Sequence, residues 1–193
     1  MSKPCRVLIE RYLPEYQFEE HHSLPTATQA AALLDAAQAV ASQTDPLINR
    51  LIGLREMPAR LMSRLGRPSQ LPSRPFGVED FILLGRNADH EIAYGLAGRF
   101  WQSDYGLQAT TSAQAFEQLT GVPKLVLNFS IESLGESGQR LCTTTRVFCP
   151  DTASLRSFKP YWVLIRPVSG FIRQRLLKRI AQHALKHPAA ANA

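Results

Sequence analysis

Cysteine is scarce in this 193-residue chain, and no long apolar run occurs in it. The three cysteines, Cys5, Cys142 and Cys149, are odd in number and lack C-x-x-C spacing, so neither a disulfide framework nor a zinc site is expected. No apolar stretch approaches the ~20 residues that a membrane-spanning helix needs. The first residues have too short an apolar core for a signal peptide, and acidic residues follow at once. The sequence therefore predicts a cytoplasmic globular protein of one domain.

Common catalytic and cofactor-binding motifs are also missing. There is no G-x-S-x-G elbow, no Walker loop and no H-E-x-x-H pair. GLAGRFW (95–101) is not a dinucleotide fingerprint, because it lies in an expected strand and opens no helix. His21 and His22 are neighbours and would point to opposite faces of a strand, while His183 and His187 would form only a weak exposed pair. We expect no metal and no cofactor, and a non-catalytic role is favoured.

Acidic residues are absent from the C-terminal segment. Residues 152–193 hold eight Lys or Arg and no Asp or Glu, whereas residues 1–151 hold fourteen basic and sixteen acidic residues. A basic amphipathic helix can lie on an anionic membrane or follow phosphates. The aromatic and basic interleaving that stacks nucleic-acid bases is missing, so no nucleic acid is expected. We interpret the charge mainly as a solvated face, with peripheral membrane contact as a secondary role.

The first expected strand carries polar residues on its apolar face. Residues 16–24 alternate loosely, with the apolar members in step, but Glu20 and His22 share their face. Pro25 is expected to close this strand. An Ala-rich helix is expected over residues 26–41.

Two shorter helices are expected between residues 45 and 66, the first starting at the proline after Asp45 and the second ending at Gly66. Residues 66–77 carry three prolines and predict an ordered loop or a flexible connector.

After this loop the pattern changes to that of strands, rich in β-branched and aromatic residues. Residues 101–122 fit either a strand and turn or a short helix, and GESG (135–138) predicts a hairpin loop. The four strand-like stretches are VEDFILLG (78–85), HEIAYGLAGRFW (90–101), KLVLNFSIESL (124–134) and RLCTTTRVFC (140–149).

Alternation within the last two strands predicts their faces. If Leu134 pairs with Arg140, Asn128 lies opposite Arg146, and a slip of one residue would reverse every side chain of the second strand. The residues then expected on one apolar face are Leu125, Leu127, Phe129, Ile131, Thr143, Thr145 and Val147.

The remaining segment predicts one long helix that covers the sheet. Its apolar residues recur at nearly helical spacing from Leu155 to Ala184. Pro160 and Pro167 would bend it, and RPVSG (166–170) is the expected kink or break. The fold class is therefore α+β: a curved antiparallel sheet wrapped around a long C-terminal helix, with short helices after the first strand.

Three motifs make the sequence resemble a known superfamily. GLAGRFW (95–101), TTTRVFCPD (143–151) and FKPYWVLIRPVSGFIRQRLLKRI (158–180) are similar to an uncharacterised bacterial subset of START-like, helix-grip proteins, which include Bet v 1-like and polyketide cyclase/dehydrase-like members. The resemblance covers residues 16 to 184. It implies a cavity between sheet and final helix. It also implies a single START-like domain at 16–187, with an N-terminal extension (1–15) and a disordered tail (188–193).

Several residues are candidates to line such a cavity, and each has a competing interpretation. Arg146 would suit a carboxylate or a polarised carbonyl, but the preferred register favours an outward arginine paired with an acid. Threonines are common in strands without any ligand, and large aromatics are more often plain core. The candidates are Tyr94, Trp101, Leu127, Phe129, Thr143, Thr145, Arg146, Tyr161, Trp162 and Ile165.

These features predict a protein that binds an apolar or amphipathic small molecule. Transport of that molecule is a further role that the same features allow. One alternative is a cyclase- or dehydrase-type enzyme that uses Arg146, Tyr94 or Tyr161. Glu79, Asp80 and Glu91 could supply a base if one faced the cavity, although solvated acids at strand ends are favoured. Another alternative is a module that docks on a membrane or an acidic partner through the basic helix.

Overall fold

The computed structural model describes residues 7–41, 80–99, 101–102, 106–135 and 138–187. The expected helices between residues 45 and 66, the loop at 66–77 and the tail at 188–193 lie outside these ranges. The elements are α1 (Val7–Tyr12), β1 (Phe18–Thr26), α2 (Ala30–Ala41), β2 (Ile82–Asn87), β3 (Glu91–Ala97), α4 (Ala113–Gln118), β4 (Lys124–Ser133), β5 (Gln139–Phe148) and α5 (Thr152–Lys186).

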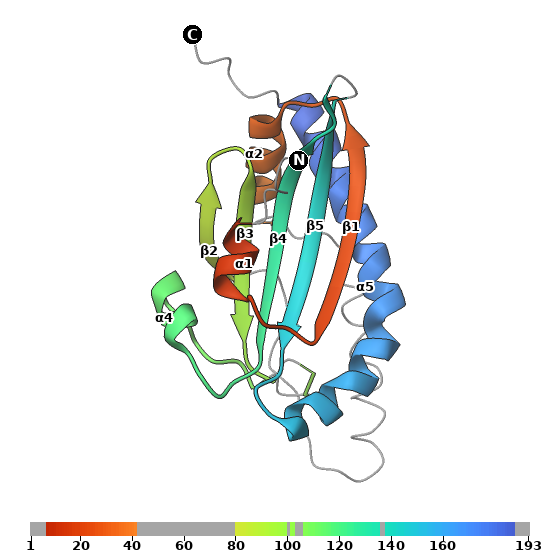
Figure 1. The fold of residues 1–193 in the computed structure, drawn as a ribbon. Coiled ribbons are helices and arrows are strands. Elements are labelled where there is room, and N and C mark those ends of the chain that lie inside the picture. Colours follow the sequence, from red (N-terminus) through yellow and green to blue (C-terminus); the bar gives the residue numbers. More distant parts are fainter. Residues whose placement is uncertain (1–6, 42–79, 100, 103–105, 136–137, 188–193) are drawn as a thin grey trace.

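The fold is α+β, as the sequence predicted. The five strands form one curved antiparallel sheet in the order β1-β5-β4-β3-β2, and the open sheet has β1 at one edge and β2 at the other (Figure 1). The ambiguous stretch at 101–122 contains the short helix α4, which Ser112 caps by accepting a hydrogen bond from the backbone N–H of Ala115.

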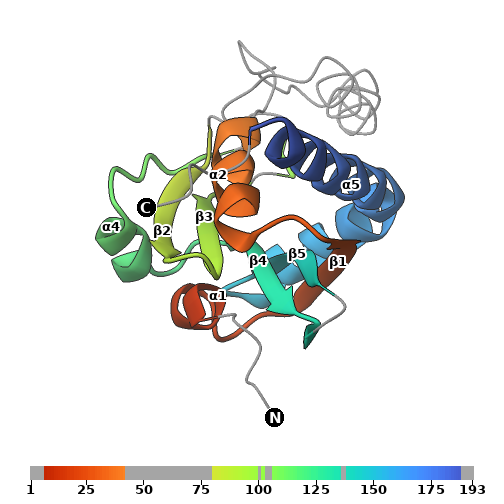
Figure 2. The ribbon, with the colours of Figure 1, turned by 90° about the horizontal axis from the view of Figure 1, so that it is seen from above.

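Helices cover both faces of this sheet. Seen from above, α2 and α5 lie on one side and α1 on the other (Figure 2). We call the side under α2 and α5 the inner face and the side under α1 the outer face. The inner core joins α2, the sheet and α5 through fully buried residues that include Leu33, Ile92 and Ile180.

The register of the β4–β5 hairpin differs from the prediction by two residues. Glu132, not Leu134, pairs with Arg140, so Asn128 lies opposite Thr144 rather than Arg146. A shift of two keeps every side chain on its expected face, because side chains alternate with a period of two. The predicted faces are therefore right although the predicted pairs are wrong.

Pro25 does not end the first strand. It lies within β1 and pairs with Arg140 of β5. Proline cannot donate to a sheet, but β1 is an edge strand, where one side of the backbone needs no partner strand.

The final helix is continuous over its 35 residues, with Pro160 and Pro167 inside it. Asp151 caps its start by accepting hydrogen bonds from the backbone N–H and the hydroxyl of Ser154, at 2.7 and 2.9 Å. A kink or break was expected at residues 166–170, and the helix does not break there. The helix instead curves as it passes from the end of the sheet to run along β1 (Figure 1).

The range predicted as an N-terminal extension contains α1, which packs on the outer face. Ile9 and Tyr12 are buried against Val126 of β4 and Phe116 of α4. Tyr12 also donates a 2.9 Å hydrogen bond to the carbonyl of Leu84 in β2. This helix therefore covers part of the sheet.

Candidate functional site

A row of side chains with three polar members crosses the inner face. Tyr94 of β3 lies opposite Leu127 of β4, Leu127 lies opposite Thr145 of β5, and Thr145 lies opposite Glu20 of β1. Directly opposite residues share a face of an antiparallel sheet, so these side chains form one line across four strands. All four are buried. We call Tyr94, Leu127, Thr145 and Glu20 the polar row.

The lines of side chains on either side of the polar row are mostly apolar. One consists of Leu96, Leu125, Val147 and Phe18, and the other of Ile92, Phe129, Thr143 and His22. Thr143 donates a 2.9 Å hydrogen bond to the backbone carbonyl of Asn128, so its hydroxyl donor is already used within the sheet. The polar groups of the inner face therefore lie in the polar row and in the adjacent line that contains Thr143 and His22.

Glu20, which is buried, and His22, which is partly exposed, form a pair at the β1 end of the row. The Nε2 atom of His22 lies 2.8 Å from Oε1 of Glu20. Gln174 of α5 approaches the other ring nitrogen, with its Nε2 atom 3.5 Å from Nδ1 of His22. Gly170 of α5 lies directly over the pair: a Cβ atom there would be 3.3 Å from Oε1 of Glu20 and 3.4 Å from Cε1 of His22.

Tyr94 carries an unsatisfied hydroxyl at the opposite end. The side chain is 9% exposed, and within the described part of the chain its buried hydroxyl has no hydrogen-bond partner. Burial raises the pKa of Tyr94 to about 12, although the positive charge of Arg86 acts in the opposite direction. The phenol is therefore neutral at ordinary pH and can donate a proton in a hydrogen bond.

Three of the predicted aromatic candidates form a cluster around Phe158 near the start of α5. Its ring centroid lies 5.3 Å from that of Trp101 and 5.7 Å from those of Tyr161 and Trp162. Phe18 of β1 completes the cluster at 4.9 Å, edge to face. Such contacts are typical of a packed core and match the competing interpretation of these residues. Ile165 is also buried on α5.

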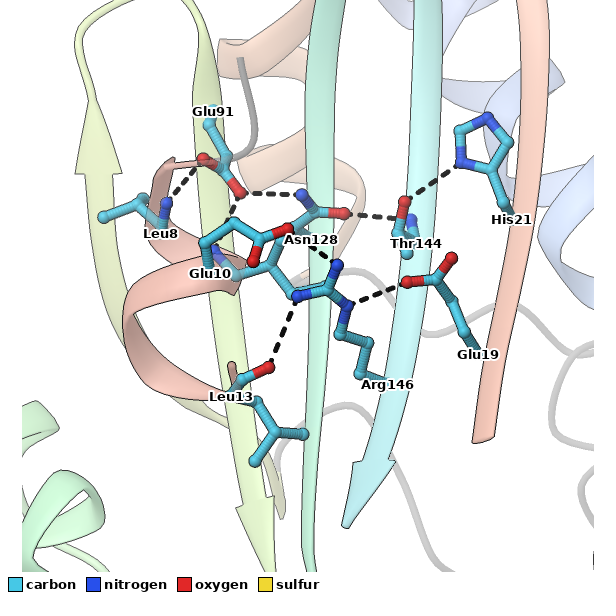
Figure 3. Close-up of polar contacts among 10 residues, drawn as sticks. Leu8, Glu10, Leu13, Glu19, His21, Glu91, Asn128, Thr144 and Arg146 are labelled. Carbon is cyan, nitrogen blue, oxygen red and sulfur yellow. Dashed lines mark hydrogen bonds and ion pairs between the residues drawn. The ribbon is translucent and has the colours of Figure 1, made fainter. Parts of the chain in front are cut away.

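Arg146 does not share the inner face with the other candidates. Its guanidinium lies on the outer face, where Nη2 donates to Glu10 at 2.7 Å, Nε to Glu19 at 2.8 Å and Nη1 to the carbonyl of Leu13 at 3.3 Å (Figure 3). It also stacks over the ring of Tyr16, 4.2 Å from the centroid. Burial acts to lower the pKa of Arg146, but the hydrogen bonds and charges of the two glutamates raise it overall. The outward, acid-paired interpretation describes this residue.

Glu91 is not the solvated strand-end acid that the sequence favoured. It is fully buried on the outer face and accepts hydrogen bonds from the backbone N–H groups of Leu8 and Ile9, at 2.7 and 3.1 Å. The side chain of Asn128 donates a third, at 2.7 Å (Figure 3). The carboxylate thus satisfies the free N–H groups at the start of α1. It does not face α5, and Glu79 lies outside the described residues.

His21 and His22 point to opposite faces of β1, as the sequence predicted. His21 points to the outer face, where Nδ1 lies 3.0 Å from the hydroxyl of Thr144, whereas His22 points to the inner face. Within the described ranges, no group of three or more His, Cys, Asp or Glu side chains could hold a metal ion. Nor does any helix in those ranges have the length and apolar character needed to cross a membrane.

Comparisons with family models, with curated proteins and with solved structures found no match for this chain. The resemblance to the START-like superfamily therefore stays a prediction that depends on the three motifs.

Sequence reasoning placed Glu20 and His22 on the right face but did not assign them to the site. The signal was present, since two polar residues at i and i+2 interrupt an apolar face. Gln174 and Gly170 could not be found in this way, because they lie about 150 residues away along the chain and only the packing of α5 brings them to the pair.

Proposed function

We propose that the protein binds an amphipathic small molecule between the inner face of the sheet and α5. The observation that carries the proposal is the buried hydroxyl of Tyr94, which has no partner in the described residues. Leaving a buried polar group unpaired costs about 1–3 kcal/mol, so native structures rarely keep one without a reason. One polar group of a ligand would supply the missing partner, and a second polar group could lie at the other end of the polar row.

The apolar lines beside the polar row suit the body of such a ligand. Contact with side chains such as Leu127, Phe129 and Trp162 would stabilise an apolar body by roughly 25 cal/mol for each Å² removed from water. The resemblance to helix-grip proteins points in the same direction, because its members enclose apolar ligands between sheet and final helix.

Native mass spectrometry of the purified full chain tests this proposal. A discrete bound small molecule should be present, should be released on denaturation, and should be apolar with at least one polar group. The Tyr94→Phe variant should retain less of it, because the phenol is lost while the ring stays. Absence of any bound molecule, together with failure of apolar probes to bind the protein at micromolar concentration, would refute the proposal.

Exposed apolar residues on the solvent side of α5 favour a second function, which is docking on an anionic membrane leaflet. Val163, Leu164 and Phe171 are 66, 56 and 56% exposed, although they are large apolar residues. Their spacing places them on one side of the helix. Exposed basic residues, Lys159 and Arg166, lie on the same segment. Apolar side chains flanked by positive charge fit an interface with anionic lipid.

Co-sedimentation with vesicles tests the docking surface. The protein should bind vesicles that contain anionic phosphatidylglycerol more than vesicles of phosphatidylcholine alone, and high salt should weaken binding by screening. Phe171→Ser should reduce binding, whereas Leu185→Ser, at a residue 70% exposed near the other end of α5, should not. Equal binding to both vesicle types, or equal effects of the two variants, would contradict docking through this surface.

A further inference from the structure

The contacts of His22 define where its protons lie. The carboxylate of Glu20 accepts hydrogen bonds, so Nε2 of His22, which lies beside it, carries a proton, and the amide nitrogen of Gln174 lies 3.5 Å from the other ring nitrogen, Nδ1. In a neutral imidazole the proton then lies on Nε2, which donates to Oε1 of Glu20 at 2.8 Å. This chain of donors runs from α5 through His22 and ends at a carboxylate. Glu20 therefore acts as the acceptor at its end.

Glu20 also lies beside the proposed ligand site. It is 8% exposed and occupies the β1 end of the polar row, next to Thr145. His22 occupies the adjacent line on the same face, so its ring covers one side of the carboxylate. An ionised carboxylate accepts up to about four hydrogen bonds, so the contact with His22, the one hydrogen bond to this carboxylate within the described residues, leaves acceptor capacity for a ligand.

We infer that Glu20 recognises the polar end of the internal ligand, and that this end is a hydrogen-bond donor without negative charge: a hydroxyl or an ammonium. The inference rests on the proposed function and narrows the ligand class. A carboxylate or sulfate placed against Glu20 would meet a like charge in a site with little water, where the repulsion is weakly screened. The Glu20 end of the polar row therefore selects against a carboxylate or sulfate group placed there.

Competition among three molecules of equal chain length tests this inference. The neutral dye Nile red reports occupation of the site, and decanol, decylamine and decanoate are added below the concentrations at which they self-associate. In the wild-type protein, the inhibition constant of decanol or of decylamine, whichever is lower, should be at least about tenfold below that of decanoate. This difference is expected for a hydrogen bond to a charged group. This comparison needs no variant, so it holds even if a substitution impairs folding.

The Glu20→Gln variant tests the residue itself. An amide can donate as well as accept, so it should bind decanoate better than a carboxylate does. The inhibition constant of decanoate should then lie within about threefold of that of the better of decanol and decylamine. The matched control is Glu117→Gln, which removes the same charge from the exposed surface of α4 and should keep the wild-type preference.

The outcomes separate the two proposals. If neither the dye nor any of the three molecules binds, the proposed function fails and this inference fails with it. If all three bind equally well, internal binding stands and the role of Glu20 is overturned. A preference that persists unchanged in Glu20→Gln would also overturn it.

Discussion

The carboxylate of Glu91 lies fully buried against the side-chain amide of Asn128, which donates a 2.7 Å hydrogen bond to it. Asn128 in turn accepts a 2.9 Å hydrogen bond from the backbone N–H of Thr144. Since Glu91 also binds the start of α1, this one pair connects α1, β3, β4 and β5. The outer face is thus stabilised by the hydrogen bonds of Glu91 and Asn128, although within the described residues the buried Oγ of Ser130 beside them has no partner, as the hydroxyl of Tyr94 has none on the inner face.

Glu91→Gln should destabilise the fold. The amide NH2 group would face the donors of Leu8, Ile9 and Asn128, so at least one buried hydrogen bond would be lost. We expect the free energy of unfolding to fall by about 2–4 kcal/mol, measured by urea denaturation. The exposed Glu117→Gln control should change it by no more than about 0.5 kcal/mol. Equal stability of the two variants would show that Glu91 is not buried in this network.

Arg146→Met should lower stability without altering ligand preference. The substitution removes the donors to Glu10, Glu19 and Leu13, and we expect a loss of about 2–3 kcal/mol by urea denaturation. Arg86→Met, at an exposed pair, should cost about 1 kcal/mol or less. Because Arg146 lies on the outer face, the preference among decanol, decylamine and decanoate should stay as in the wild type. A change in that preference would place Arg146 in the binding site.

Tyr94 should make the protein lose stability at alkaline pH. Its pKa is raised in the folded state from 10.0 to about 12, so the folded state holds the phenol proton in a range where the unfolded chain releases it. The unfolded state then binds fewer protons, and the free energy of unfolding falls as pH rises from about 10 to about 12. Tyr94→Phe should lose about 1–3 kcal/mol less than the wild type over this range, as urea midpoints would show. If the free energy of unfolding fell equally with pH in the wild type and in Tyr94→Phe, this prediction would be contradicted.

A bulky side chain at position 170 should separate α5 from β1. A Cβ atom there already lies 3.3 Å from Oε1 of Glu20, so the further atoms in Gly170→Leu must displace the helix or the Glu20–His22 pair. We expect a loss of about 1–3 kcal/mol in unfolding free energy, despite the better helix propensity of leucine. Lys178→Leu adds a similar side chain on the exposed side of α5 and should stay within about 0.5 kcal/mol of the wild type. Equal effects would mean that α5 does not lie this close to the pair.

The fold could be predicted because its signals are local. Period-two alternation marked β4, β-branched and aromatic residues marked β5, and nearly helical spacing from Leu155 to Ala184 marked α5. The exact pairing of the hairpin depends on the geometry of its loop, and the composition of GESG does not define it. An error of two residues was therefore possible, while the faces came out right.

The site was less predictable because its contacts join distant parts of the chain. Tyr94, Thr145 and Glu20 belong to three strands, and they form one row only once the strand order and register are known. The outer face shows the same limit. Nothing local to α1 indicates that Glu91 and Arg146 hold it in place, because both lie more than 70 residues away.

The pairing of β1 with β5 has a consequence for synthesis on the ribosome. In the sequence, β5 lies roughly a hundred residues after β1. A ribosome adds about 5–20 residues per second, so on the order of ten seconds pass between the synthesis of β1 and that of its partner strand. During this time Phe18 lacks its aromatic partners Phe158 and Trp162, since α5 emerges later still. Nascent chains should therefore be most prone to aggregate before residue 148 has left the exit tunnel, and holdase chaperones should act on them in that interval.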